Sequence, residues 1–234
     1  FKQFEQQTEA PSTSEYTNLD YNIAYTYFKQ KKYSEATQYF NSFISKHKED
    51  KVRLNDAYLR LADGYFVSSR YSDAISAYEK AIAVGQLEND YAFFQKAMSY
   101  GYISQDAKKR SELEQFISTY KNSKLRDDAM YALGDSYVKS GDDAKAIQTF
   151  DRLISEYKTS PFNSKAQLRQ GLVFYNKSDN QRALTKLKAV AENYPNSAEA
   201  NQAVSTARLI YIDLGQVDAY AAWVNTLDYV EVTD

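Results

Sequence analysis

A short motif that recurs at a fixed spacing is the feature that most constrains this chain. Tyr120, Tyr157 and Tyr194 lie 37 residues apart, and a serine follows each of them three positions later. An alanine follows each of these serines after six more residues. A fixed period of this length is typical of proteins built from stacked copies of one supersecondary unit. The sequence therefore predicts a repeat architecture.

Each repeat contains two further patterns. In the first, a small residue precedes an aromatic one by three positions; the pairs are Ala24 and Tyr27, Ala62 and Tyr65, Ala97 and Tyr100, Gly134 and Tyr137, and Gly171 and Phe174. In the second, an alanine precedes a bulky apolar residue by four positions; the pairs are Ala36 and Phe40, Ala74 and Tyr78, Ala146 and Phe150, and Ala183 and Leu187. These spacings are helical rather than alternating, so two helices are expected in each repeat. Lys109 and Arg208 interrupt the patterns in repeats 3 and 6.

Turn residues separate the two expected helices. Ser34, Ser72 and Asp142 precede second helices, where a short oxygen-bearing side chain accepts hydrogen bonds from free N–H groups. Gly141 and Gly215 are expected in the tight turn between helices, where a left-handed backbone costs glycine little.

These patterns predict an all-α fold, an α-α superhelix of about six helix-turn-helix repeats. One helix pair buries only one side, so neighbouring pairs must stack to form a continuous core. We expect a single solenoid domain over residues 17–230, preceded by a remnant of an earlier helix and linker (1–16) and followed by a tail (231–234). The predicted repeats are 17–48, 55–86, 90–121, 127–158, 164–195 and 201–228.

Composition argues against several classes of function. The net charge of −2 gives no general attraction to nucleic acid, and no apolar run reaches the ~18 residues of a membrane span. The chain has no cysteine, its single histidine (His47) lies in a polar stretch, and no glycine-rich phosphate loop is present. We therefore expect no catalytic residue, no cofactor and no metal site. A helical carbohydrate-active enzyme remains a minor alternative, since its carboxylates would come from distant parts of the chain.

The spacing of small, aromatic, alanine and bulky residues resembles the tetratricopeptide repeat family, from about Asn18 to Leu227. Family repeats usually span about 34 residues. The longer repeat found here, with its Tyr-Pro-Asn-Ser link, resembles extended repeats of bacterial envelope proteins, such as an outer-membrane assembly lipoprotein and the Tol-Pal coordinator. That resemblance implies a segment of a longer protein in the periplasm or cell envelope, with the cytoplasm as the alternative.

The resemblance also implies that the first helices line a concave face that binds a protein or peptide partner. The residues placed there are Tyr21, Tyr25, Phe28, Asp63, Phe66, Phe94, Tyr102, Tyr131, Asp135 and Tyr175. Such a face suits an apolar or Arg/Lys-bearing segment. The Lys and Asn residues with which chaperone-binding relatives hold a C-terminal carboxylate are replaced here, for example by Tyr21 and Tyr25, so no such ligand is expected. Two alternatives stay open: the rings pack against neighbouring helices or against missing repeats of a longer parent protein, or the chain is a structural spacer or self-association module within a larger protein.

Overall fold

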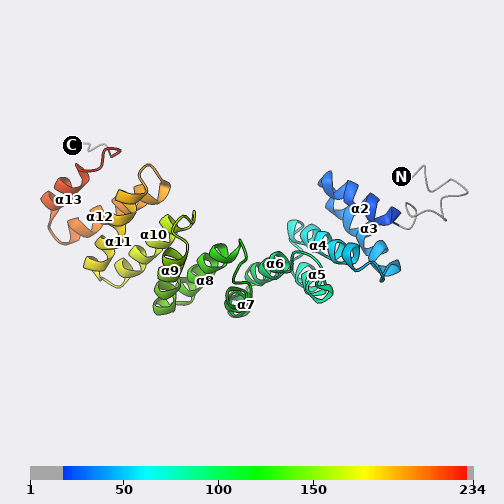
Figure 1. Cartoon of the computed structure of the whole chain (residues 1–234). Coiled ribbons are helices and arrows are strands. Elements are labelled where there is room, and N and C mark those ends of the chain that lie inside the picture. Colours follow the sequence, from blue (N-terminus) through cyan, green and yellow to red (C-terminus); the bar gives the residue numbers. More distant parts are fainter. Residues whose placement is uncertain (1–17, 231–234) are drawn as a thin grey trace, which may run out of the picture. The chain divides into compact units, whose positions relative to one another are not determined.

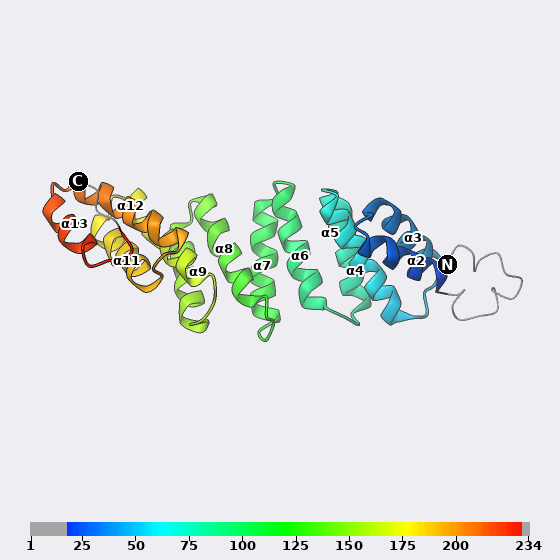
Figure 2. The same ribbon diagram turned by 90° about the horizontal axis from the view of Figure 1, so that it is seen from above.

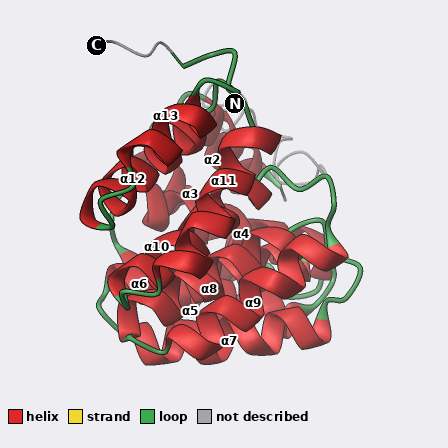
Figure 3. Ribbon diagram, turned by 90° about the vertical axis from the view of Figure 1, so that its left-hand side faces the viewer, coloured by secondary structure: helices red, strands yellow, loops and turns green. Residues whose placement is uncertain are grey.

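The computed structural model describes residues 18–230, which form twelve α-helices joined by short turns and contain no strand (Figure 3). The expected all-α helix-turn-helix fold is therefore confirmed. The predicted segments 1–16 and 231–234 lie outside the described residues.

The chain divides into two compact units, residues 1–125 and 126–234, called here the N-terminal and C-terminal units. In the N-terminal unit the helices are α2 (Leu19–Lys29), α3 (Tyr33–Lys46), α4 (Lys51–Val67), α5 (Tyr71–Val84), α6 (Asn89–Tyr102) and α7 (Asp106–Thr119). Each helix packs against the next in antiparallel fashion, as Figures 1 and 2 show for α4 to α7. The first helices α2 and α4 also touch each other.

The C-terminal unit repeats this arrangement. Its helices are α8 (Arg126–Ser140), α9 (Asp143–Glu156), α10 (Asn163–Asn176), α11 (Asn180–Asn193), α12 (Ala198–Asp213) and α13 (Val217–Val224). Each unit thus contains three helix pairs, and the pairs fall within or close to the six expected repeats. That the repeats form one continuous domain stays a prediction.

The small residue of the first helix faces the bulky residue of the second helix. A Cβ atom added to Gly134 would lie 2.4 Å from the Phe150 ring, and one added to Gly171 would lie 2.8 Å from Leu187. Ala24, in the same position of repeat 1, is fully buried. The spacing seen in the sequence therefore reflects a close helix contact within each repeat.

The aromatic residue of the first helix carries a cation over its ring in five repeats. The pairs are Lys32 on Tyr27 at 5.9 Å, Arg70 on Tyr65 at 4.3 Å, Lys108 on Tyr100 at 4.3 Å, Lys145 on Tyr137 at 5.3 Å and Arg182 on Phe174 at 4.5 Å. Tyr100 and Tyr137 are buried, whereas Tyr27 and Tyr65 are half-buried. The ring thus packs at the helix contact, and a cation lies over its face.

The Tyr-x-x-Ser motif joins consecutive repeats. Ser123 donates a hydrogen bond to Asp90 at 2.6 Å, and Ser160 donates one to Asp127 at 2.7 Å. These bonds fix each link to the start of the first helix of its own repeat. Each serine hydroxyl also accepts a hydrogen bond from the backbone N–H two residues further on. Ser197 differs, since it caps α12 by accepting the N–H of Ala200 at 3.0 Å.

Every turn between the helices of a repeat contains one residue in the left-handed region. These residues and their φ values are Lys31 (60°), Ser69 (59°), Ser104 (59°), Gly141 (76°), Ser178 (58°) and Gly215 (66°). The expectation for Gly141 and Gly215 is confirmed, and Asp142 caps α9 through the N–H of Lys145 at 3.2 Å.

The N-cap predictions for Ser34 and Ser72 are wrong. The capping positions are Lys32 and Arg70, neither of which caps through its side chain, and both serines lie inside their helices. The reason is that the left-handed residue completes the turn. The residue that follows it therefore already occupies the N-cap position, two residues before the serine.

We expect Ser178→Gly to stabilise the protein by about 1 kcal/mol, because glycine adopts a positive φ without the steric cost of a Cβ atom. Urea unfolding followed by circular dichroism measures the change. Ser155→Gly is the matched control: Ser155 is an exposed residue of α9, where glycine should destabilise by roughly 0.5 kcal/mol. A destabilising effect at both positions would contradict the role assigned to the turn.

Candidate protein-binding face

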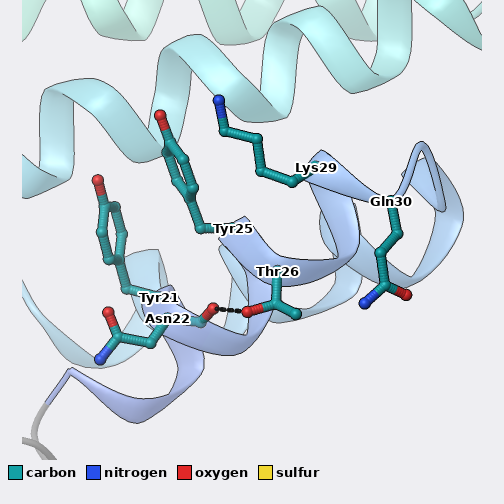
Figure 4. Close-up of a pocket in the computed structure, with 6 residues that line it drawn as sticks. All are labelled: Tyr21, Asn22, Tyr25, Thr26, Lys29 and Gln30. Atoms are coloured by element: carbon teal, nitrogen blue, oxygen red, sulfur yellow. Dashed lines mark hydrogen bonds between the residues drawn. The ribbon is translucent and has the colours of Figure 1, made fainter.

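A shallow pocket runs along α2 in the N-terminal unit. Its volume is about 550 Å³, and it is lined by Tyr21, Asn22, Tyr25, Thr26, Lys29 and Gln30. These residues form two rows along the helix (Figure 4). One row consists of two rings and a lysine, and the other of two amides and a hydroxyl. The α2 pocket therefore combines aromatic surface with hydrogen-bonding groups.

Tyr21 forms a fixed wall of this pocket. Its ring lies 5.3 Å from that of Phe43, and its hydroxyl donates a hydrogen bond to Asp56 of α4 at 2.7 Å. Burial, together with the Asp56 carboxylate, raises the pKa of Tyr21 well above its usual value. The hydroxyl is thus held by the protein, and the ring remains to contact a ligand.

Tyr25 continues the aromatic row. Its ring lies 5.9 Å from that of Tyr21 and 6.5 Å from that of Phe28, and Lys29 Nζ lies 5.4 Å from its centroid. Tyr21, Tyr25 and Phe28, three residues predicted for the partner-binding face, are therefore brought together here. All three are partly buried, so part of each ring supports the core.

The second row is polar. The Thr26 hydroxyl donates to the carbonyl oxygen of Asn22 at 2.8 Å. Within residues 18–230, the side chains of Asn22 and Gln30 form no hydrogen bond. Their amide groups can therefore bind the backbone of an extended peptide.

Asp63 lies at the centre of an internal network and is only 9% exposed. One of its oxygens accepts hydrogen bonds from Tyr78 at 2.7 Å and Tyr91 at 2.8 Å, and the other accepts one from Arg60 at 2.9 Å. Burial and the Asp63 carboxylate raise the pKa values of both tyrosines. Arg60 also contacts Asp56 at 3.2 Å. The Asp63 carboxylate, which was predicted to attract a cation of the partner, is thus already bound by side chains of the protein itself.

Phe66 and Tyr102 form a second aromatic group with a residue that the sequence analysis did not single out. Tyr71 stacks on Tyr102 at 4.6 Å, and Phe66 meets both rings edge-on at 5.5 Å. Tyr102 is 57% exposed. Phe94 instead packs on Phe116 at 5.8 Å. Tyr71 was missed because it begins a second helix, where no groove residue was expected.

The C-terminal unit holds the remaining predicted residues. Tyr131 stacks on Phe162 at 5.1 Å. Asp135 forms ion pairs with Arg169 at 3.0 Å and Lys139 at 3.1 Å, while Tyr175 packs against the core of this unit. Each of these groups thus has a partner within its own unit.

Two observations bear on other kinds of site. None of the helices in residues 18–230 is both long and apolar enough to cross a membrane. In the same residues, no three His, Cys, Asp or Glu side chains group together in a way that would hold a metal ion.

Comparison with known proteins identifies the repeat. A tetratricopeptide repeat family model matches residues 113–163 and 131–198, and a second model with the same description matches residues 19–50. No curated protein sequence matches the chain significantly.

Solved structures show the same fold at low sequence identity. A tetratricopeptide repeat protein from Parabacteroides merdae is 13% identical, with a TM-score of 0.66, over 93% of this chain and 81% of that one. YrrB, described as a TPR protein with an unusual peptide-binding site, is 18% identical, with a TM-score of 0.62, over 86% of this chain and 95% of YrrB. MamA from Desulfovibrio magneticus is 18% identical, with a TM-score of 0.61, over 77% and 97% of the two chains.

Proposed function

The chain is built from tetratricopeptide repeats, and we propose that it is a non-catalytic adaptor that binds a segment of a partner protein on its first helices. The α2 pocket carries this proposal. Rings supply large contact area at low cost in side-chain entropy, and the amides of Asn22 and Gln30 supply hydrogen bonds to a peptide backbone. The peptide-binding site ascribed to YrrB, which has the same fold, is consistent with this function.

The proposed site extends beyond the pocket to the other predicted residues. In the N-terminal unit it includes Phe28, Phe66, Phe94 and Tyr102. In the C-terminal unit Tyr131, Asp135 and Tyr175 form a separate candidate surface. Asp63 acts indirectly in this proposal, because its hydrogen bonds hold Tyr78 and Tyr91 in place behind the surface.

Site-specific crosslinking tests the proposal. A photoreactive benzophenone side chain at position 25 should give a discrete adduct with a partner protein in the native cell. The matched control is position 38, an exposed residue of the second helix α3. Tyr25→Ala should lower co-purification of the crosslinked partner by tenfold or more, since aromatic anchors often contribute ~2 kcal/mol. Equal adducts from positions 25 and 38 would argue against a specific pocket.

One observation favours the alternative of a self-association module. Four half-exposed apolar residues lie close together in sequence, from the end of α12 to the start of α13: Leu209, Ile212, Leu214 and Val217. Such a patch suits contact with another protein surface. A concentration-dependent mass in sedimentation, abolished by Ile212→Glu, would favour this second function.

We also propose that the chain belongs to a bacterial cell-envelope protein. The support is the 37-residue repeat and its Tyr-x-x-Ser links. Fractionation of the native cell into cytoplasm, periplasm and membrane tests this location.

A further inference from the structure

The charged side chains at the C-terminal end of α2 are mostly positive. Lys29, Lys31 and Lys32 lie at the end of α2 and in the turn to α3, all three are exposed, and none forms an ion pair within residues 18–230. Glu35, an exposed residue in the first turn of α3, is the nearby acidic group. Lys29, which lines the pocket, and the lysines of the following turn thus outnumber Glu35 at the C-terminal end of α2. Lys32 itself lies over the Tyr27 ring, 5.9 Å from its centroid.

The carboxylates near Tyr21 form their ion pairs with other residues than these lysines. Asp20 binds Lys46 at 2.7 Å and accepts a hydrogen bond from Ser42 at 2.7 Å. Asp56 binds Arg60 at 3.2 Å, a guanidinium that it shares with Asp63 and Glu88, and its other oxygen accepts the Tyr21 hydroxyl. These acidic groups therefore do not neutralise the three lysines.

Lys29 connects this charge to the pocket. Its Nζ lies 5.4 Å from the centroid of the Tyr25 ring, and Figure 4 shows it extending from the same side of α2 as Tyr21 and Tyr25. A ligand side chain packed on the two rings would thus have a cation beside it. Charge complementarity then decides which segment binds best.

We propose that the α2 pocket recognises an acidic segment of a partner protein, in which an apolar or aromatic side chain is flanked by Glu or Asp. The ring of Tyr25 takes the apolar side chain, Lys29 takes the neighbouring carboxylate, and Asn22 and Gln30 take the peptide backbone. This inference rests on the proposed function and specifies its partner. It also reverses the expectation of an Arg/Lys-bearing segment, because Asp63 is closed off inside the protein.

A basic segment fits the site less well. Its charge would lie beside Lys29, and like charges placed together oppose binding. A neutral segment would use the rings but leave the lysines without a contribution. Binding of the acidic segment should weaken as salt is raised, since exposed charges are screened.

Capped hexapeptides test the inference with the full chain. An array has Phe, Leu or Trp in the centre and Glu, Gln or Lys at the flanking positions, and blocked termini remove any free carboxylate end. Fluorescence anisotropy should show the tightest binding for the Glu-flanked members. Lys29→Glu should weaken these by roughly five- to tenfold, whereas Lys29→Arg should leave them nearly unchanged. Lys121→Glu, at an exposed site in the link after α7, is the matched control and should have little effect.

The possible outcomes separate this inference from the proposed function. If peptides bind through Tyr25 but Gln- or Lys-flanked members bind as well as Glu-flanked ones, the acidic specificity is overturned and the adaptor function survives. If no member binds, or if binding persists in Tyr25→Ala, the α2 pocket is not the peptide site and both proposals fail there. Sedimentation of the free chain detects a second copy as the occupant: a dimer lost in Tyr25→Ala would overturn the inference.

Discussion

Replacing Gly134 with leucine should lower the free energy of unfolding by about 1–3 kcal/mol, the usual cost of overpacking a tight contact. A Cβ atom at this position would lie 2.4 Å from the Phe150 ring, closer than atoms of a folded protein can approach. Leucine has a higher helix propensity than glycine by roughly 0.8 kcal/mol, so a net loss shows that the steric clash dominates. Urea unfolding followed by circular dichroism measures the difference.

Two further variants test the origin of this loss. Ala144→Leu places leucine at an exposed position of α9 and should change stability by less than about 0.5 kcal/mol. Phe150→Ala opens space opposite Gly134, so the double variant should be less destabilised than the sum of the two single variants. Strict additivity would mean that Gly134 and Phe150 do not oppose each other.

Asp63→Ala should destabilise the protein by about 3 kcal/mol, because it leaves two tyrosine hydroxyls and part of Arg60 without a partner in a mostly buried place. Tyr78 is almost fully buried and donates only to Asp63 among the described contacts. Asp63→Asn retains an acceptor for the tyrosines and should cost less. The free energy of unfolding in urea is again the measurement.

An exposed pair with the same sequence spacing serves as the control. Asp73 binds Arg70 at 2.7 Å, three residues away, but both side chains are about half exposed. Asp73→Ala should therefore cost less than about 1 kcal/mol. In the Asp63→Ala background, Tyr78→Phe should be neutral or stabilising, since it removes a buried hydroxyl that has already lost its acceptor. A full additional loss from Tyr78→Phe would contradict the network.

Much of the fold could be predicted because its determinants are local. The small–aromatic and alanine–bulky spacings reflect helical periodicity, and they placed Gly134 and Phe150 on the two helices of one repeat. The structure added that these two residues meet. Helix starts were less predictable. Ser34 and Ser72 looked like N-caps, but a left-handed residue in each turn places the start of the helix before the serine. Only two of the six left-handed residues are glycines, so most of these turns carry no sequence signal.

The candidate site could be predicted only in part. Tyr21, Tyr25 and Phe28 lie on one helix at helical spacing, so their grouping follows from the sequence. Whether Asp63 is open or closed depends on Tyr91, which is 28 residues away and belongs to the next repeat. No periodic pattern indicates whether the two side chains will meet.

The sequence by itself determined that this protein is a series of helix pairs with a 37-residue period, because helical spacing and the stacking of repeats leave a regular pattern of residue size. The tertiary structure decided which charges are paired inside the protein and which remain exposed at its surface. The physical reason is that ion pairs and hydrogen bonds depend on distances of a few ångströms between side chains of different repeats. Asp56 and Asp63 are held in this way, and Lys29 is left beside the Tyr25 ring.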